Sequence, residues 1–486
     1  MNQLANLEPA KVYEFFRQIS AIPHGSGNTA QIMQFCLDFA AQRGLKAVKD
    51  EGDNVIIYAP GTAGYENSEP IIIQGHMDMV CEKTADCQKN METDGLDLCT
   101  DGEWLWADGT TLGGDDGIAL AYMFALLDSD DIPHPPLECV ITRDEETGMF
   151  GAELFDASLV KGKKILNIDS EEEGILTVSC AGGITAHCEF ELQNRYIAPA
   201  YTYEITVSGL RGGHSGVDIG KGRLNAFEML SKPLARISKP CHFGTITGGG
   251  KHNVIPQNAS IVFGCDEDIL DHLEQVVRFC NEQHFGGDAE PDLLFSVKEI
   301  CADKNVKFQE NTIFFWYIYD FLRFLPTGVQ SMSKSIEGMV ETSLNMGVLE
   351  MNDIFMSCDF LIRSNTDSGK DAVVETVRSF CESIGDEIDF DGMTLSAEYP
   401  AWEYRKDSPL RDLMVEVFRD QYGREPVVAG IHAGLECGIF SKKIEDADAV
   451  SFGPDIENIH TPKERLNIAS AQRTWEFLKE ILRRSK

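Results

Sequence analysis

Two adjacent carboxylates stand just before an apolar run in the stretch TLGGDDGIAL, residues 111–120. Asp115 and Asp116 follow a glycine pair, and no basic residue in the stretch could neutralise them. Aspartate in the first turn of a helix suits the positive end of the helix dipole, so capping is one interpretation. A metal ligand is the other, because a bound cation would remove the repulsion between the two charges.

Histidine and acidic residues also follow other short apolar runs. Such runs, among them IIIQGH at 71–76 and LECVIT at 137–142, are typical of buried strands. In an open α/β sheet the carboxyl ends of the strands face the ligand crevice, where these side chains would meet. Five residues occupy such positions: His76, Glu145, Glu146, Asp169 and His460. Each type also has an ordinary alternative: a turn for aspartate, a solvated loop for glutamate and an exposed surface position for histidine.

A pair of divalent cations accounts for the whole set. The carboxylate of Asp115 could bridge two cations about 3.5–4 Å apart, the usual spacing of co-catalytic metals. His76 with Asp169 would complete one site, and His460 with Glu146 would complete the other. These ligands suit Zn²⁺ first, and Mn²⁺ and Co²⁺ share them. Magnesium in a phosphohydrolase is an alternative, because Asp-rich clusters also suit Mg²⁺.

Two further acidic residues predict how such a centre would work. Asp78, two residues after His76, could accept a hydrogen bond from the imidazole nitrogen that does not bind metal and so fix the tautomer of the ring. Glu145 would remain uncoordinated and could take a proton from a metal-bridging water. In di-zinc hydrolysis the metals acidify water and polarise a carbonyl, while a carboxylate handles protons.

Composition excludes several other classes of protein. Asp and Glu outnumber Lys and Arg by 79 to 42, giving a formal charge of −37, which argues against nucleic acid or an anionic membrane as the main partner. No basic segment followed by an apolar stretch opens the chain, and no run approaches the roughly 18 apolar residues of a membrane span. The 14 cysteines include no CxxC pair. We therefore expect a reduced, cytoplasmic protein.

Three segments differ in their pattern. Residues 1–186 alternate helix-like and strand-like runs, which predicts an α/β domain, and the apolar run at 117–128 predicts a buried helix. Residues 187–396 contain half-exposed strands such as YTYEITVSGL, together with helices, which predicts an inserted α+β domain. Residues 397–486 return to the first pattern and complete the α/β domain.

Five motifs carry a resemblance to a known family: HMD, GGDDGIA, DEETGMFGA, NIDSEE and ENIHTP, in this order. They resemble the di-zinc metallopeptidase superfamily that includes carboxypeptidase G, aminoacylase and carnosinase. The segments LGGDDGIA, RGGHSGVDI and IHAGLECGIF are similar to those of the aminoacyl-histidine (Xaa-His) dipeptidases. The resemblance to these dipeptidases covers essentially the whole chain. The resemblance implies the same seven site residues in the same roles, and a cis peptide bond between Asp115 and Asp116.

The resemblance also implies a fold and residues that contact substrate. The fold would be an aminopeptidase-like α/β catalytic domain, its mixed sheet flanked by helices, with the inserted domain as a lid that forms a homodimer. In that domain His214 would donate to the developing oxyanion, Asn253 would contact substrate and Arg363 would grip the substrate carboxylate. Gly434 would let the backbone approach substrate, although several relatives carry GGTD in this loop. The alternatives are a flexible glycine-rich loop for His214 and a surface charge at a strand end for Arg363.

These expectations combine into one predicted function. The chain is predicted to be a cytosolic di-metal dipeptidase that hydrolyses Xaa-His and related unblocked dipeptides, with Glu145 as the general base. An N-acyl amino acid deacylase of the same superfamily is the alternative. A non-catalytic binding protein is disfavoured because no predicted ligand or base is missing.

Overall fold

The computed structural model describes the 486 residues apart from 1–3, 5–6, 193–194, 302–305, 352–354 and 385–387. The chain forms two compact units. The first comprises residues 1–179, 404–430 and 435–486, so it contains both ends of the chain, and the second comprises 180–403 and 431–434. The segment expected to be inserted, 187–396, lies within the second unit. None of the described helices is long and apolar enough to cross a membrane.

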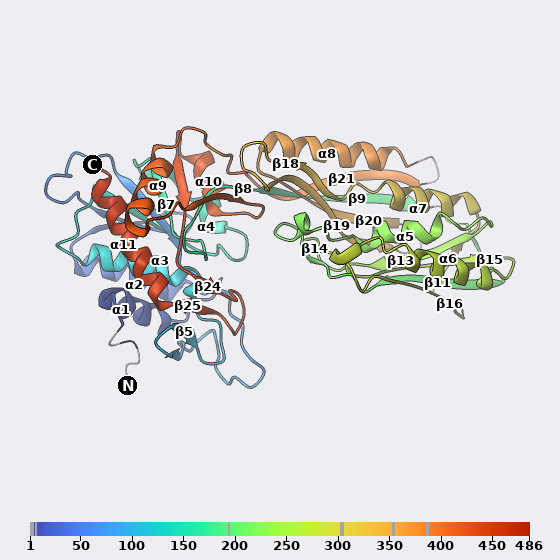
Figure 1. Ribbon diagram of the computed structural model, residues 1–486, viewed down its shortest axis with the longest axis horizontal. Coiled ribbons are helices and arrows are strands. Elements are labelled where there is room, and N and C mark those ends of the chain that lie inside the picture. Colours follow the sequence, from blue (N-terminus) through green and yellow to red (C-terminus); the bar gives the residue numbers. More distant parts are fainter. Residues whose placement is uncertain (1–3, 5–6, 193–194, 302–305, 352–354, 385–387) are drawn as a thin grey trace. The chain divides into compact units, whose positions relative to one another are not determined.

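An eight-stranded mixed sheet organises the first unit (Figure 1). In spatial order its strands are β1 (Lys46–Lys49), β2 (Val55–Ala59), β6 (Leu137–Thr142), β3 (Ile71–His76), β7 (Lys164–Asn167), β23 (Asp448–Ser451), β8 (Ile175–Cys180) and β22 (Val427–Ile431). The central pairs β6–β3, β3–β7 and β7–β23 are parallel, whereas β1–β2, β2–β6 and β23–β8 are antiparallel. Every residue of β3 and β6 is buried, as expected for strands with helices on both faces.

Helices and a small second sheet complete this unit. The helices are α1 (Ala10–Ser20), α2 (Ala30–Gln42), α3 (Gly114–Leu127), α4 (Phe150–Leu154), η1 (Ala157–Leu159), α9 (Pro409–Tyr422), α10 (Glu436–Lys443) and α11 (Ile468–Arg484). The second sheet consists of β24 (Ile456–Glu457), β25 (Arg465–Asn467), β5 (Trp104–Ala107) and β4 (Leu98–Thr100). The predicted buried helix is confirmed, because α3 is buried continuously from Asp116 to Leu126. The predicted α/β class and mixed sheet are also confirmed.

The second unit contains two larger antiparallel sheets with helices, and it has its own apolar core. The five-stranded sheet has the order β18 (Gly328–Met332), β19 (Val340–Met351), β20 (Phe355–Ser364), β9 (Gly182–Leu192) and β21 (Ile388–Tyr399). The four-stranded sheet has the order β13 (His242–Gly248), β15 (Ala259–Cys265), β11 (Tyr201–Ser208) and β16 (Leu294–Glu299).

Shorter elements and helices connect these sheets. The two-stranded pairs are β10 (Tyr196–Ile197) with β17 (Phe308–Gln309), and β12 (Gly213–His214) with β14 (Val254–Ile255). The helices are α5 (Ala226–Leu234), α6 (Leu270–Glu282), α7 (Thr312–Phe324), α8 (Asp367–Glu382), η2 (Ile219–Lys221) and η3 (Gly287–Ala289). Phe227, Phe263 and Phe315 are fully buried in the core that these elements share.

Candidate active site

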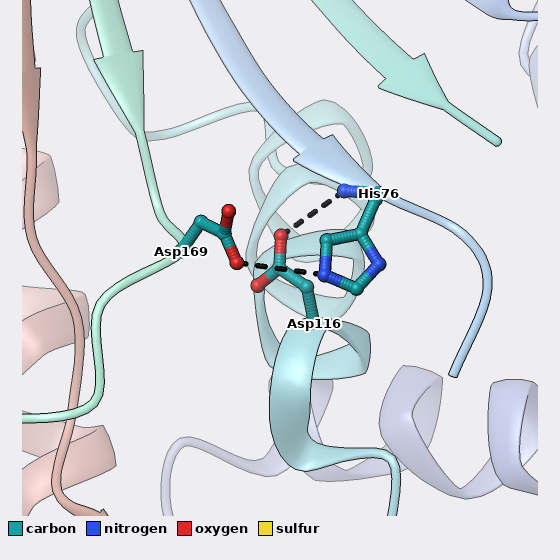
Figure 2. Close-up of side chains that lie close together, drawn as sticks. All are labelled: His76, Asp116 and Asp169. Carbon is teal, nitrogen blue, oxygen red and sulfur yellow. Dashed lines mark hydrogen bonds and ion pairs between the residues drawn. The ribbon is translucent and has the colours of Figure 1, made fainter. Parts of the chain in front are cut away.

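His76 is the last residue of β3 and points across the carboxyl end of the central strands. Its Nε2 lies 3.1 Å from Asp115 Oδ1 and 3.4 Å from Asp169 Oδ1. Asp169 follows β7, which is parallel to β3, so the topology brings their ends together. Figure 2 shows Asp169 and Asp116 beside the imidazole. The expectation that these strand ends would meet at one edge of the sheet is therefore met.

The two adjacent aspartates point in different directions because the backbone between them is irregular. The Asp115–Asp116 peptide bond is cis, as the family resemblance implied. Both residues have non-helical φ/ψ angles although they lie within the bounds of α3. The buried Asp116 carboxylate accepts a hydrogen bond from the His76 backbone N–H, at 3.1 Å (Figure 2). Asp116 therefore anchors α3 to the end of β3 and does not cap the helix, which corrects the capping interpretation for this residue.

His460 approaches the other oxygen of Asp115. Its Nε2 lies 3.2 Å from Asp115 Oδ2 and 3.0 Å from Glu146 Oε1. The Glu146 Oε1 atom is buried, so this contact with His460 involves a carboxylate oxygen that is shielded from solvent. Asp115 thus presents one oxygen to each of two imidazoles, which is the arrangement expected of a shared ligand.

Three groups of side chains are compact enough to hold a cation, with one potential ligand atom from each member and all atoms of a group within 4.8 Å of one another. These groups are His76 with Asp116 and Asp169, His76 with Glu145 and Glu146, and Asp115 with Glu146 and His460. The third group is the same as one of the two sets expected from the sequence. Asp116 enters the first group although the sequence reasoning gave it no ligand role. Its closeness to His76 depends on the bend in the backbone, which residue types alone do not reveal.

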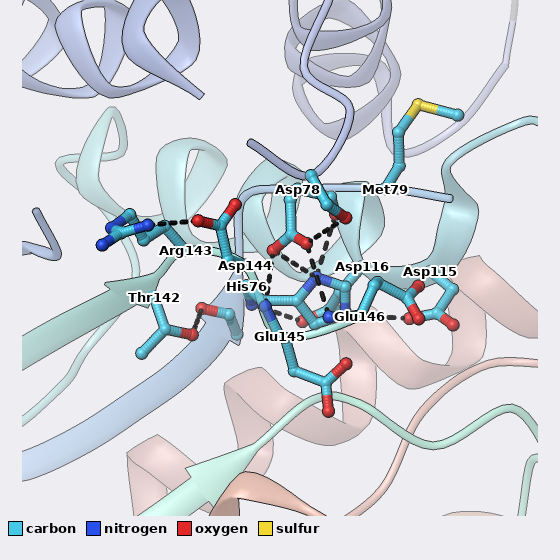
Figure 3. Close-up of polar contacts among 12 residues, drawn as sticks. His76, Asp78, Met79, Asp115, Asp116, Thr142, Arg143, Asp144, Glu145 and Glu146 are labelled. Atoms are coloured by element: carbon cyan, nitrogen blue, oxygen red, sulfur yellow. Dashed lines mark hydrogen bonds and ion pairs between the residues drawn. The ribbon is translucent and has the colours of Figure 1, made fainter. Parts of the chain in front are cut away.

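Asp78 connects the imidazole of His76 to the segment that carries both glutamates (Figure 3). Its Oδ1 accepts from the Glu145 backbone N–H at 3.0 Å, and its Oδ2 accepts from the hydroxyl of Ser26 at 2.7 Å. His76 Nδ1 is 2.9 Å from the backbone carbonyl oxygen of Asp78 and 3.5 Å from its carboxylate. The backbone carbonyl is thus the nearer acceptor for the imidazole N–H, where the sequence reasoning expected the carboxylate. Either acceptor leaves Nε2 directed at Asp115 and Asp169.

Burial and neighbouring acids shift the pKa values at this centre. Burial, reinforced by Asp169, Glu436 and Glu146, raises the pKa of Glu145 well above its usual range despite the nearby His76. Burial also raises the pKa of Asp115, but hydrogen bonds with His460 and His76 outweigh it and lower the pKa.

The two histidines show how strongly the centre attracts positive charge. Burial lowers the pKa of His76, but contacts with Asp115 and Asp169 outweigh it and raise the pKa well above 6.5. Contacts with Asp115 and Glu146 raise the pKa of His460 to about 11. This cluster of acids is therefore built to accept cationic charge.

Two other buried glutamates support the centre and were not identified from the sequence. Glu464 accepts backbone N–H groups from Leu112 and Gly114, each at 2.8 Å, and more distantly from Gly113 and Asp115. Glu436 accepts from the side chains of Gln74 and Thr142 beneath the strand ends. Burial is the largest cause that raises the pKa of Glu464 to about 7 and that of Glu436 to about 8. The only signal for Glu464 in the sequence is that an acidic residue follows His460 by four positions, in the run TPKER.

The second unit contains the remaining predicted site residues. His214 Nε2 lies 3.5 Å from Arg363 Nη2, so these two side chains are neighbours. Asn253 lies close to His214 along the backbone, because its carbonyl accepts from the Ser215 N–H at 2.9 Å. Gly434 ends the segment 431–434, which belongs to this unit. Arg363 is 93% buried, which does not fit the alternative of a surface charge.

Comparison with known proteins identifies the class. The model of peptidase family M20/M25/M40 matches residues 72–484, and the chain belongs to this family. The chain is a peptidase, as the resemblance implied.

The most informative relatives cover nearly the whole chain. It is 34% identical over 488 residues to the cytosol non-specific dipeptidase of Escherichia coli (strain K12), with 99% of each chain covered. The crystal structure of aminoacylhistidine dipeptidase from Vibrio alginolyticus matches with a TM-score of 0.90 and 34% identity, over 99% of this chain and 98% of that one. A tripeptidase from Staphylococcus aureus, at 15% identity and a TM-score of 0.55, over 99% of each chain, shares the fold.

Proposed function

We propose that this peptidase is a dipeptidase that hydrolyses Xaa-His and related unblocked dipeptides at a centre of two divalent cations. The observation that carries the proposal is the position of Asp115, whose two carboxylate oxygens lie 3.1 and 3.2 Å from the Nε2 atoms of His76 and His460. The names of the E. coli and Vibrio relatives support the substrate class, and they disfavour the deacylase alternative.

The donor set fits a pair of cations. His76 and Asp169 would hold one cation, His460 and Glu146 would hold the other, and Asp115 would bind both. The clearest sign of fit is that potential ligand atoms of Asp115, Glu146 and His460 lie within 4.8 Å of one another, because one cation could contact all three. Mixed imidazole and carboxylate ligands favour Zn²⁺, with Mn²⁺ or Co²⁺ as substitutes. When bound, such ions acidify water and polarise a carbonyl.

The residues of the chain handle protons and orientation. Glu145 is placed to take a proton from the attacking water and to deliver it to the leaving amine, and burial raises its pKa well above its usual range, as suits a group that exchanges protons. Asp78 would help to position Glu145 and His76. Its carboxylate accepts a hydrogen bond from the backbone N–H of Glu145 and lies 3.5 Å from Nδ1 of His76. In the second unit, His214 would donate to the developing oxyanion, and Arg363 would bind the substrate carboxylate. Asn253 would contact the substrate, and Gly434 would let the backbone approach it closely.

The proposal extends to the organisation of the protein. The inserted segment 187–396 would act as a lid and carry the contacts of a homodimer, as the resemblance implies. The name of the E. coli relative supports a cytoplasmic location. The partners would be small dipeptides, with no role for nucleic acid or a membrane surface.

The test compares Glu145→Gln with wild type in metal content and in turnover. We expect two metal ions per chain to be retained and turnover of alanyl-histidine to fall at least about 100-fold, because general acid–base catalysis contributes about 10²–10⁴. Glu153→Gln, an exposed glutamate on α4, is the matched control and should turn over normally. Retained turnover in Glu145→Gln would contradict the general-base role. A wild-type protein active only on N-acetyl amino acids would contradict the dipeptidase proposal.

A further inference from the structure

Arg363 is a buried cation whose guanidinium has few acceptors. It is 7% exposed, and among the described residues no carboxylate forms an ion pair with it. Its Nη1 donates to the hydroxyl oxygen of Tyr399 at 2.5 Å, while its buried Nε has no hydrogen-bond partner in the described part of the chain. Since a buried charge without a counter-charge is costly, an anionic ligand is expected here.

Tyr399 reaches Arg363 because a glycine separates them on the sheet. Strand β9 lies between β20 and β21, and Gly183 on β9 is the register partner of both Arg363 and Tyr399. Directly paired residues on neighbouring strands point to the same face, so both side chains lie over Gly183. A Cβ atom at Gly183 would lie 2.5 Å from the Tyr399 Cζ and hydroxyl oxygen. The missing side chain at this position therefore makes room for the phenol ring.

A second neighbour of the guanidinium, His214, is also a donor. His214 Nδ1 lies 3.2 Å from the backbone N–H groups of Gly216 and Val217, which can only donate. Nδ1 must therefore accept, and the proton of the neutral ring is on Nε2. Burial and the Arg363 charge lower the pKa of His214, which keeps the ring neutral. Two donors, Arg363 Nη2 and His214 Nε2, thus face each other at 3.5 Å, and an acceptor is required to satisfy both.

The Tyr399 contact determines which edge of the guanidinium is left open. Because Tyr399 occupies Nη1, the edge formed by Nε and Nη2 remains for a ligand. Two parallel N–H groups on this edge match the two oxygens of a carboxylate. An amide, with one oxygen and an N–H₂ donor, does not match a set made only of donors.

We propose that Tyr399, seated on Gly183, is a positioning residue that orients Arg363 and thereby selects ligands with a free C-terminal carboxylate. This role deepens the proposed function and rests on it, since it assigns the carboxylate of the dipeptide to Arg363. Tyr399 is not itself a catalytic residue, and its effect is on substrate affinity.

The test separates binding from turnover. In Tyr399→Phe we expect KM for alanyl-histidine to rise about tenfold with kcat within about twofold of wild type, because one hydrogen bond to a charged group is lost. The KM for alanyl-histidinamide should not change. Gly183→Ala should reproduce this pattern, because its Cβ would displace the Tyr399 ring. Tyr203→Phe removes a phenol hydroxyl elsewhere in the same unit, where it contacts Asp268, and should behave as wild type.

Calorimetric binding to the metal-loaded protein gives a second measurement that does not depend on turnover. Wild type should bind L-histidine more tightly than L-histidinamide, and Tyr399→Phe should reduce this preference about tenfold. Equal preference in wild type and Tyr399→Phe would overturn the inference, as would a fall in kcat with KM unchanged. If wild type hydrolyses no dipeptide, the proposed function fails, while the binding preference still decides the role of Tyr399.

Discussion

At the scale of single residues, histidines of this chain differ in what surrounds them. His76 and His460 contact carboxylates, which raise their pKa values. His432 lies instead among neutral groups and near a cation. Its Nε2 is 2.7 Å from the Ser343 hydroxyl and its Nδ1 is 3.1 Å from Asn365 Oδ1. Burial, reinforced by the charge of Arg363, lowers the pKa of His432 to about 3.

This shift predicts a loss of stability in acid. The folded pKa of about 3 lies below the usual 6.5, so between these values the unfolded chain binds a proton at His432 that the native state does not. The free energy of unfolding should therefore fall as pH falls from 6.5 towards 3, by up to about 1.4 kcal/mol per pH unit from this group. His432→Gln should show a shallower decline in urea titrations from pH 7 to pH 4. The difference in slope should vanish above pH 7, and equal slopes below pH 6 would contradict the prediction.

At the scale of elements, the proposed metal centre depends on how closely α3 packs against β3. Gly75 on β3 leaves room for α3, because a Cβ there would lie 2.4 Å from Asp116 Oδ2 and 2.8 Å from the Ala119 Cβ. The Asp116 carboxylate occupies this space and accepts from the His76 N–H. The packing of one helix on one strand thus places both the aspartate pair and the histidine.

Gly75→Ala should therefore destabilise the protein and weaken its metal binding. Overpacking of a tight contact costs about 1–3 kcal/mol, and the displaced atoms belong to Asp116 and α3. Gly250→Ala is the matched control, because a Cβ there meets nothing within 4 Å and its φ is not positive. Urea unfolding and zinc titration measure the two effects. A Gly75→Ala protein as stable as Gly250→Ala would show that α3 can move away without cost.

The same elements show what the sequence can and cannot predict. Apolar runs predict the strands and α3, and the residue types that follow them predict which side chains come together, because strand ends in a parallel sheet meet at one edge. The start of α3 is different. Local sequence favours capping by Asp116. In the structure, however, the N–H groups of Leu112 and Gly114 donate hydrogen bonds to Glu464, about 350 positions further along the chain. Such a partner depends on tertiary structure, and no local pattern reveals it.

At the scale of the whole molecule, the chain separates into two units with different chemistry. The first unit gathers acids and two imidazoles at the ends of its central strands, whereas in the second unit Arg363 and His214 present donors. The order of the strands explains the gathering, since β3 lies between β6 and β7 although β6 follows it by more than 60 residues. The boundaries of the predicted insertion follow a change in pattern, but the pairing of Arg363 and Tyr399 across Gly183 depends on register. A single sequence does not specify that register.

Metal removal should lower the stability of the whole protein. The carboxylates of Asp115, Glu146 and Asp169 repel one another at the centre, and cations that bind only the native state stabilise it by mass action. At about a thousandfold excess over Kd this linkage amounts to about 4 kcal/mol, which corresponds to a melting temperature about 10 °C higher for a unit of this size. Calorimetry before and after treatment with a chelator should show this decrease, and added Zn²⁺ should reverse it.

The variant Asp115→Asn decides whether the effect arises at the proposed centre. An amide in place of the shared carboxylate weakens both cation sites at once, so the difference between chelated and zinc-loaded protein should shrink to a small fraction of the wild-type value. The same substitution also removes the charge that pairs with His76 and His460, whose contacts lower the pKa of Asp115, so the chelated variant should melt at a lower temperature than the chelated wild type. A chelator effect of equal size in both proteins would place the stabilising cation elsewhere in the molecule.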